Sequence, residues 1–448
     1  MPLDANRQDV SEHPPDGRGA DEATRTQPRR VLMLAHAFPP GSDSGVPRTV
    51  KFIKYLDRLG WRSTVIAPMP GVNDPSSDDA GFGDSIPATT EVVRAGVSGD
   101  HDSQFWNALH RLPMYWRVAD AVRAALEFPD AFATWARQAL PIARAELARR
   151  RHRIIYSTSP PVTSHYIALQ LKREFGLPWV ADFRDPWTDD ALLYGNPPRW
   201  RRSLDRKFER RIYKTADRIV VNTPTNRTTL IERHGVPPEK VIAITNGYDE
   251  EDFQGIKGSP PTDRFRIAYC GTFHSTYNPT TFLRALKALL VREPGAPVVF
   301  TLAGRACDWI RNNVHDPELL VHCELLGQIS HHDVYALLAA SHLLLHTYPQ
   351  GIPYSVPGKL YEYLRSGRPV VAICDRPSEV ASMLESTGRG RAFRPDEAEE
   401  LAAFLRAEYA RWRVDGTASS IRVDDRIRIY ERAALTARLA EVFEKIAK

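Results

Sequence analysis

The feature that most constrains the fold is an alternation of strand-like and helix-like segments that occurs twice along the chain. The first series starts near Arg30 with the apolar segment VLMLAHAF, followed by a glycine-containing loop, the helical pattern TVKFIKYLDRLG and the strand-like STVIAP. Continuous apolar segments of this length are typical of parallel strands that are buried on both faces. Strand, loop, helix and strand in this order predict the start of a doubly wound α/β domain.

Four further strand-like segments, at residues 153–159, 178–183, 217–223 and 240–247, complete the first series. A stretch rich in Gly, Pro and Asp then interrupts the alternation, which starts again at RFRIAYCGT and ends with PVVAIC. A chain of 448 residues is longer than one hydrophobic core normally supports. We therefore predict two Rossmann-like, doubly wound domains facing each other across a cleft, over residues 29–255 and 262–420.

Three segments lie outside this pattern. Residues 1–28 are polar, without the apolar core of a secretory signal, and we expect a disordered tail. Residues 70–150 read as a helical insertion near the cleft mouth, suited to acceptor recognition or membrane contact. The alternative is an ordinary helical cap packed through its tryptophans, Trp106, Trp116 and Trp135. Residues 421–448 have the pattern of an amphipathic helix, which we expect to pack back on the N-terminal domain.

Composition narrows the class of protein. The net charge of +5 is mild for this length, so nucleic-acid binding is not expected. The four cysteines have no Cys-x-x-Cys spacing, which favours reduced thiols and a cytoplasmic location. No apolar run reaches the roughly 20 residues of a membrane span. The basic segment 199–214 reads as a scaffold helix with Trp200, Leu204, Phe208 and Ile212 on one apolar face; peripheral contact with anionic lipid, on the inner face of the membrane, is the alternative.

Two polar motifs follow predicted strands of the first domain. Gly45, in GSDSGVPR, precedes a helix, so its backbone can approach a ligand closely; the alternative is a tight turn. DFRDPW brings Asp182, Arg184 and Asp185 to the carboxyl end of an apolar strand, where open α/β sheets bind ligands. These three side chains could instead pair with one another to fix the loop.

Two motifs of the second domain suit an anionic ligand. Gly271 and Thr272 follow a strand, where backbone amides can meet a diphosphate. In PGKLYE, Pro357 and Gly358 precede Lys359, so that helix amides, the helix dipole and the ammonium converge on one site. Glu362 lies three residues after Lys359 and suits the hydroxyls of a ribose. The alternative is an exposed salt bridge between Lys359 and Glu362.

Four stretches together resemble one known family: AHAFPPGSDSGVPR, DFRDPW, VIAITNGYDEEDF and PGKLYEYLRSGRPVVA. The chain resembles retaining glycosyltransferases of the GT-B fold, glycosyltransferase family 4, over most of residues 30–445. The resemblance implies transfer of a hexosyl or related sugar from a nucleotide diphosphate sugar to a hydroxyl acceptor, with retention and without a metal or other cofactor. It also implies that the second domain binds the nucleotide and the first the acceptor.

The sequence departs from the family pattern at two places. The Arg and Lys that many members carry after the first strand of the second domain are replaced by residues that include Thr272, Phe273 and His274. Of the two Glu residues that members carry with seven residues between them, only Glu362 is present, and Tyr354 takes the place of the other. The only Asp-x-Asp, at residues 100–102, lies away from any predicted strand end, which argues against a metal site.

These observations define the candidate site. We expect catalytic roles for Asp182, Arg184, Asp185 and Lys359, with a carboxylate accepting the acceptor's proton. His165, after STSPPVTS, is a candidate on the acceptor side. The donor would be bound by Gly45, Gly271, Thr272, Pro357, Gly358, Lys359, Leu360 and Glu362. A nucleotide-sugar epimerase of the same fold and a non-catalytic nucleotide-sugar-binding protein remain alternatives, and polysaccharide, glycolipid and secondary-metabolite acceptors are all open.

Overall fold

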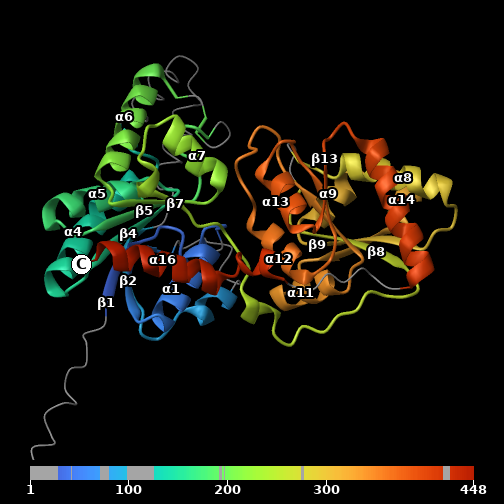
Figure 1. The fold of residues 1–448 in the computed structure, drawn as a ribbon, viewed down its shortest axis with the longest axis horizontal. Helices are drawn as coiled ribbons and strands as arrows, with labels where there is room; N and C mark the ends of the chain where they lie inside the picture. Colours follow the sequence, from blue (N-terminus) through green and yellow to red (C-terminus); the bar gives the residue numbers. More distant parts are fainter. Residues whose placement is uncertain are drawn as a thin grey trace, which may run out of the picture.

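The computed structural model describes residues 29–41, 43–70, 80–97, 126–190, 194–195, 197–273, 277–416 and 424–447. They form two α/β domains that lie side by side (Figure 1). The predictions for the N-terminal tail, for Trp106 and Trp116, and for residues 100–102 fall outside the described residues.

The first domain is built on a seven-stranded parallel sheet with the strand order β3-β2-β1-β4-β5-β6-β7. The order changes direction between β1 and β4, which is where open α/β sheets form their ligand crevice. The strands are β1 (Arg29–Leu34), β2 (Trp61–Met69), β3 (Glu91–Val97), β4 (Ile154–Ser159), β5 (Trp179–Phe183), β6 (Arg218–Val221) and β7 (Val241–Ala243).

Helices cover both faces of this sheet, as the continuous apolar strands require. One face packs against α4, α5 and α6, and the other against α1 and the C-terminal helix α16. The bounds are α1 (Val46–Arg58), α4 (Ala133–Arg149), α5 (Thr163–Phe175), α6 (Arg199–Thr215), α7 (Pro224–Glu232) and α16 (Arg432–Ile446), with short 3-10 turns at Ala80–Ser85 and Pro238–Lys240.

The segment predicted as a helical insertion contributes to the sheet domain itself. β3 pairs in parallel with β2 and extends the sheet at its edge. α4 packs on the sheet, and its own residue Trp135 is buried in the core between this helix and the sheet. The described part of residues 70–150 is therefore one more strand and helix of the doubly wound domain.

The second domain has a six-stranded parallel sheet with the order β10-β9-β8-β11-β12-β13. Its strands are β8 (Phe265–Cys270), β9 (Val298–Ala303), β10 (Cys323–Gly327), β11 (Leu343–Thr347), β12 (Val370–Ile373) and β13 (Gly390–Phe393). One face packs against α8 (Thr280–Arg292), α9 (Ala306–Asn313) and α14 (Ala398–Asp415). The other packs against α11 (His331–Ala339), α12 (Gly358–Ser366), α13 (Glu379–Thr387) and α15 (Asp425–Arg428), and α10 (Pro317–Leu320) lies beside α8.

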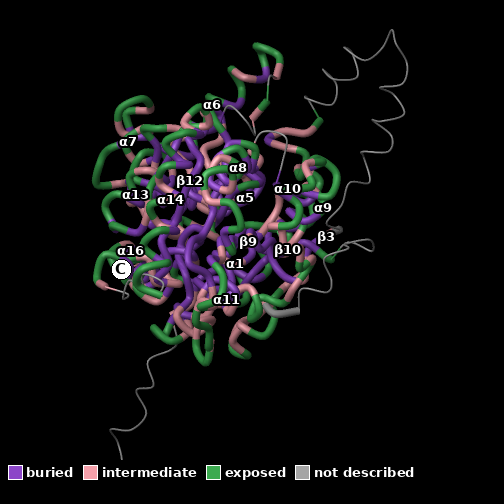
Figure 2. The backbone as a smooth tube through the Cα atoms, turned by 90° about the vertical axis from the view of Figure 1, so that its right-hand side faces the viewer, coloured by how far each residue is buried: buried purple, intermediate pink, exposed green. Residues whose placement is uncertain are grey.

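The buried residues follow the two sheets and the inner faces of their helices (Figure 2). The C-terminal helix α16 belongs to the core of the first domain, although it follows the second domain in sequence. Leu435, Leu439 and Phe443 are fully buried, and the Phe443 ring lies 5.2 Å from that of Trp61. Each such side chain contributes about 1.5–3 kcal/mol by leaving water, so α16 is an integral part of the first domain.

Two chain segments cross between the domains and lie side by side. The Tyr248 amide donates to the Tyr430 carbonyl at 3.1 Å, and the Arg432 amide donates to the Tyr248 carbonyl at 2.8 Å. A β-carbon on Gly247 would lie 2.0 Å from the Tyr430 carbonyl oxygen, so only glycine fits there. Asp249 attaches the first crossing to α1. Its carboxylate forms ion pairs with Lys51, whose Nζ lies 2.6 Å from Oδ2, and with Lys54, and it accepts a hydrogen bond from the Tyr55 hydroxyl.

The basic helix α6 differs from the prediction. Phe208 and Ile212 are buried, but Trp200 is 46% exposed and Leu204 40% exposed. Of the four side chains predicted to form one apolar face, two are therefore buried and two lie at the surface.

Candidate active site

Two glycines follow neighbouring strands of the second domain. Gly271, after β8, has φ +135°, and a β-carbon there would lie 2.8 Å from Nζ of Lys359. Gly304, after β9, has φ +84°, and its β-carbon would lie 2.8 Å from the carbonyl oxygen of Gly271. Glycine tolerates both conformations without steric cost. Glycine at these positions therefore lets the Lys359 ammonium and the Gly271 carbonyl lie against the main chain at this edge of the sheet.

Lys359 reaches this edge from the N-terminus of α12. Its Nζ donates to the Tyr269 hydroxyl at 3.0 Å and lies 4.5 Å from the centre of that ring. The Tyr269 hydroxyl donates in turn to the carbonyl of Thr272 at 2.8 Å. Within the described parts of the chain, Lys359 has no carboxylate within 4.0 Å. A cation without a counter-ion beside a helix N-terminus is suited to binding an anion.

The other predicted residues of the α12 N-terminus differ in how exposed they are. Pro357 is the N-cap residue, its carbonyl accepts a hydrogen bond from the Leu360 amide at 3.1 Å, and no side chain of the described residues caps the helix. Leu360 is fully buried in the core with its amide already bonded, so the prediction that Leu360 binds the donor is not supported by its position. Gly358 is exposed and opens the helix.

Glu362 and Lys359 do not pair with each other. Glu362 accepts a hydrogen bond from the Tyr335 hydroxyl of α11 at 3.4 Å. Burial raises the pKa of the Glu362 carboxyl, and the charge of Arg432 acts in the opposite direction as a smaller cause. The simple salt bridge is therefore excluded, and the two charged groups face different surroundings.

His346 is a buried polar residue that sequence reasoning missed. It lies near the end of β11 and is fully buried, and neither ring nitrogen has a hydrogen-bond partner among the residues that the structure describes. Burial, with the positive charge of Lys359 as a smaller cause, lowers the pKa of His346 well below its usual value. The signal in the sequence is a single His within the apolar strand LLLHT.

Arg305 is a second residue that sequence reasoning missed. It follows Gly304 and caps α9, whose first amide, that of Ala306, donates to the Gly271 carbonyl at 2.8 Å. Arg305 is exposed and, among the described residues, has no carboxylate within 4.0 Å. The structure thus places a base at the same strand edge where the sequence lacks the expected Arg and Lys.

In the first domain, Gly45 and the DFRDPW loop are in contact. A β-carbon on Gly45 would lie 1.8 Å from Nη1 of Arg184. Nε of Arg184 pairs with Oδ2 of Asp185 at 3.1 Å, and both side chains are partly exposed. The structure therefore brings together three predicted residues from two loops, and Gly45 makes room for Arg184.

Asp182 has a different setting from the one predicted. It is fully buried, and its oxygens accept from Arg48 Nε at 2.9 Å, Arg48 Nη2 at 2.8 Å and the Tyr156 hydroxyl at 2.5 Å. Burial alone would raise the pKa of Asp182, but the attraction of Arg48 outweighs it and the pKa is lowered. A fully buried carboxylate with this many donors does not contact a substrate, so the catalytic prediction for Asp182 is wrong.

The prediction for His165 is also wrong. His165 is fully buried in α5, with Nδ1 2.8 Å from the Ser157 hydroxyl and Nε2 2.9 Å from the Ser159 hydroxyl. Burial lowers the pKa of His165 to about 3. It is a neutral core histidine with both nitrogens bonded, and it has no face toward an acceptor.

The domains meet close to these groups. The Thr223 hydroxyl, at the end of β6, donates to the Tyr354 carbonyl at 2.7 Å. The Thr225 amide donates to Oε1 of Glu379 at 2.6 Å. Tyr354 is the residue found in place of the second acid, and its main chain therefore lies at the domain junction.

The described residues contain no group of three or more His, Cys, Asp or Glu side chains arranged to hold a metal ion. Nor does any described helix have the length and apolar character needed to cross a membrane.

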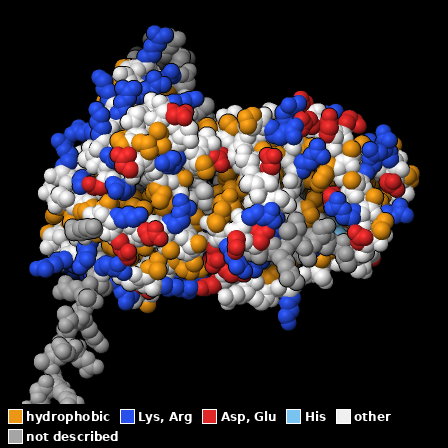
Figure 3. All heavy atoms as spheres, in the orientation of Figure 1, with side chains coloured by type: hydrophobic (Ala, Val, Ile, Leu, Met, Phe, Trp, Pro, Cys, Tyr) orange, Lys and Arg blue, Asp and Glu red, His pale blue; other side chains and the backbone are white. Residues whose placement is uncertain are grey.

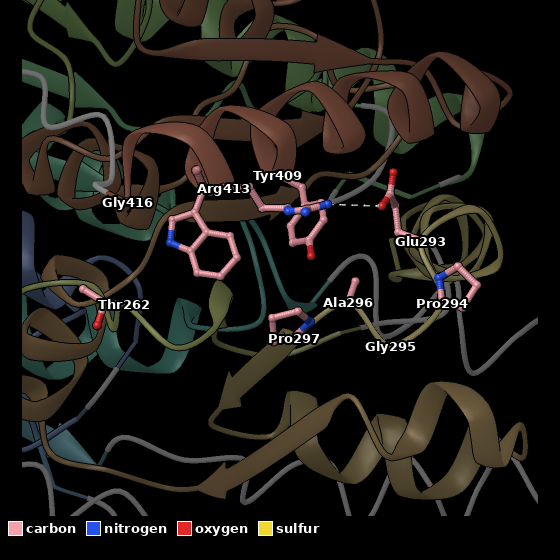
Figure 4. Close-up of a pocket in the computed structure, with 10 residues that line it drawn as sticks. Thr262, Glu293, Pro294, Gly295, Ala296, Pro297, Tyr409, Arg413 and Gly416 are labelled. Carbon is pink, nitrogen blue, oxygen red and sulfur yellow. Dashed lines mark ion pairs between the residues drawn. The ribbon is translucent and has the colours of Figure 1, made fainter.

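A surface pocket of about 440 Å³ lies elsewhere (Figure 4). It is formed by segments that precede β8 and β9 and by the end of α14, where Arg413 lies 3.7 Å from Glu293. This is the amino-terminal edge of the second sheet, opposite the edge that carries Gly271 and Lys359. The pocket is therefore separate from the candidate site.

Two family models match the chain in succession. Residues 45–247 match the glycosyl transferase 4-like domain, and residues 264–409 match glycosyl transferases group 1. The chain belongs to the GT-B glycosyltransferases. The boundary between the two matches coincides with the crossing that follows Gly247, and together the matches include both halves of the candidate site.

Curated relatives of this GT-B glycosyltransferase match over limited lengths. A D-inositol 3-phosphate glycosyltransferase of Saccharomonospora viridis is 31% identical over 112 residues, which is 23% of this chain and 26% of the relative. One from Paenarthrobacter aurescens is 25% identical over 172 residues, 36% of this chain and 42% of the relative. The chain thus spans less than half the length of these relatives.

Solved structures confirm the GT-B fold over nearly the whole chain. A glycosyltransferase from Rickettsia africae has 14% identity and a TM-score of 0.61, with 94% of this chain and 99% of that chain covered. Anabaena HepE in complex with UDP and glucose has 15% identity and a TM-score of 0.59, with 93% and 100% covered. Sucrose-phosphate synthase from Thermosynechococcus elongatus has 16% identity and a TM-score of 0.59, with 93% and 98% covered.

Proposed function

We propose that the protein transfers a sugar, with retention, from a nucleotide diphosphate sugar to a hydroxyl acceptor, without a metal ion. The observation that carries the proposal is the Lys359 ammonium beside Gly271 and the α12 N-terminus, with no described carboxylate within 4.0 Å to neutralise it. Family membership and the UDP found in the HepE structure agree with this choice of donor.

The second domain would bind the donor. The diphosphate would lie against the main chain of Gly271 and Thr272 and the amides at Gly358 and Lys359. Charge accumulates on the diphosphate as the sugar leaves, and a preorganised cation with helix amides stabilises that charge more than it stabilises the ground state. Arg305 supplies a second positive group at the same edge. Glu362 would accept the hydroxyls of the ribose.

The first domain would bind the acceptor. Arg184 and Asp185 are partly exposed at the carboxyl end of β5, with Gly45 beside them. Asp185 is the carboxylate in this group with access to an incoming hydroxyl, and we assign it the role of accepting the acceptor's proton. Asp182 would act through Arg48 to hold the surrounding loops.

The protein would act in the cytosol. The four cysteines are free thiols, and Cys270, Cys307 and Cys374 are buried, as expected for a protein that folds in a reducing compartment. The curated relatives are named D-inositol 3-phosphate glycosyltransferase and match this chain over less than half of their own length.

The test is a thermal-shift series with UDP, GDP, ADP and their glucose conjugates on the wild type, Lys359→Met and the control Lys257→Met, which removes an exposed lysine. A ligand that binds only the folded state raises the unfolding midpoint, by about 2.7 kcal/mol of stability at a hundred times its Kd. We expect one nucleotide to stabilise the wild type and Lys257→Met but to stabilise Lys359→Met much less.

The absence of a shift with every nucleotide in the wild type would contradict the donor assignment. A nucleotide that binds while its sugar conjugate is neither hydrolysed nor transferred would favour the non-catalytic alternative. Formation of an epimer from donor alone would favour the epimerase.

A further inference from the structure

The exposed surface of α6 carries positive charge only. Its two acidic residues both turn inward: Asp205 pairs with Arg201 at 2.7 Å, and Glu209 accepts from Thr188. The exposed charged residues of the helix are all bases, namely Arg199, Arg206, Lys207, Arg210, Arg211 and Lys214. Figure 3 shows Lys and Arg side chains gathered over the region of α6. Since the acids are already paired in the protein, these bases are not neutralised from their own helix.

Apolar side chains lie at the amino-terminal half of the same surface. Trp200 and Leu204 are spaced by four residues and therefore share one helix face, with 46% and 40% of their area exposed. Leu126 is 58% exposed and lies nearby, because the segment that follows it is bonded to α6 through Arg201 Nη2 and the Pro129 carbonyl, at 2.6 Å. Lys207 and Arg211 continue the Trp200 and Leu204 face along the helix.

We propose that this α6 surface, made of Leu126, Trp200, Leu204 and the six exposed bases, docks the protein on an anionic lipid bilayer. The helix would lie along the bilayer surface, with the bases near lipid phosphates and the apolar side chains at the boundary of the acyl chains. Tryptophan favours that boundary because its ring is apolar and its N–H is polar. Exposed Leu and Trp side chains distinguish this surface from one made for nucleic acid, which has no apolar layer to receive two leucines.

The surface does not depend on the proposed donor site, so the two proposals can fail separately. It gives a physical reason why Trp200 and Leu204, two of the four apolar side chains predicted for α6, are exposed. Trp200 and Leu204 are kept in water at a cost in apolar exposure, which contact with acyl chains would remove.

The experiment is flotation of the full chain with vesicles of phosphatidylcholine alone and of phosphatidylcholine with about one third phosphatidylglycerol. Two variants test the surface. The first replaces the four bases Arg206, Lys207, Arg210 and Arg211 by Gln, and the second is Trp200→Ser with Leu204→Ser. The matched control replaces four exposed bases of the second domain by Gln: Arg284, Lys287, Arg292 and Arg391.

We expect the wild type and the matched control to bind the anionic vesicles and not the neutral ones. The α6 charge variant should bind about a hundredfold less well, since each base near the surface contributes to the attraction. The apolar variant should bind about tenfold less well than the wild type. Its remaining binding should be more sensitive to salt than that of the wild type, because it depends on charge alone.

Three outcomes would overturn the proposal: no binding of the wild type to anionic vesicles, equal losses in the α6 and control charge variants, or binding to a DNA duplex of similar charge as tight as to the vesicles. The thermal midpoints of all variants should stay near that of the wild type because every substituted side chain is exposed. If one α6 variant does not fold, the other still decides the result.

Discussion

Nζ of Lys359 lies 2.8 Å from the point where a β-carbon on Gly271 would stand. The two residues are 88 positions apart and come from different elements, a strand end and a helix N-terminus. Their closeness depends on Gly271 having no side chain and on its φ of +135°, which other residues rarely adopt. The position of the Lys359 ammonium therefore depends on the absence of a side chain at Gly271.

Replacing Gly271 by Ala should displace Lys359 and strain the loop. We expect nucleotide affinity to fall about tenfold or more, with a loss of stability on the order of 1–3 kcal/mol from the unfavourable backbone. Titration calorimetry with the preferred nucleotide and denaturant unfolding would measure the two effects. Gly255→Ala is the matched control: it has positive φ but no atom within 4 Å of the new methyl, so it should lose stability without losing affinity.

Arg305→Gln should weaken donor use although Arg305 belongs to no predicted motif. Losing one preorganised donor at a developing charge typically costs a factor of about 100–1000 in turnover, and the exposed position of Arg305 favours the lower end. Steady-state kinetics with the identified donor would measure the change in kcat/KM. Arg292→Gln removes an exposed base at the far end of α8 and serves as the control. Unchanged kcat/KM in Arg305→Gln would show that Lys359 and the helix amides act without it.

Asp182→Asn should destabilise the first domain, because Arg48 would keep its charge in a buried site without its partner. Breaking a buried ion pair costs about 3–5 kcal/mol. Chemical unfolding of Asp182→Asn, Arg48→Met and the double variant would give the coupling energy, and the double variant should lose less than the sum of the single ones. The pKa of Asp182 is lowered from 3.8, so this contribution is full above about pH 4 and is lost as the pH falls below it. A single variant as stable as the wild type would contradict this account.

His165 should make stability depend on pH in mildly acidic solution. Its pKa falls from 6.5 in the unfolded chain to about 3 in the folded protein because of burial, so protonation favours unfolding. The contribution is complete above pH 6.5 and decreases by about 1.4 kcal/mol per pH unit as the pH falls from there toward 3. His165→Gln removes this proton, so the slope of its unfolding free energy against pH between 6 and 4 should be smaller by about that amount. Equal slopes for the two proteins would show that His165 is not buried neutral.

The regular parts of the fold could be predicted because their signal is local. The segments VLMLAHAF and PVVFTLAG are mostly apolar, as is typical of strands covered on both faces, and RIIYSTS has the apolar residues Ile154 and Ile155; each segment contains a strand of the structure. β3 was missed because Glu91, Arg94 and Gly96 interrupt its apolar residues and because it lies after residues rich in Gly, Asp and Ser, as an edge strand can. α4 was read as part of an insertion because nothing in its own pattern shows which sheet it covers.

Only the parts of the candidate site that follow strand ends in recognisable motifs were predicted from the sequence. The Gly271 and Lys359 motifs lie together because both follow strands of the same sheet. Asp182 was misassigned because its partner Arg48 lies 134 residues away, and a carboxylate in a polar motif looks the same whether it faces solvent or a buried guanidinium. Arg305 and His346 were missed because neither belongs to a recognised pattern, and only the fold shows that they neighbour the site.

The paired crossings at Tyr248 and Tyr430 have a mechanical consequence. A single chain crossing between two domains permits both twisting and bending of one domain relative to the other. Two crossings that are hydrogen-bonded to each other permit little motion except rotation about the line through both crossings. We infer that any movement of one domain relative to the other would be a rotation about this line, which passes close to Gly247. A rotation restricted in this way would carry Lys359 and Gly271 toward or away from Arg184 and Asp185 along one fixed path, so that the alignment of the two halves of the candidate site would be reproducible.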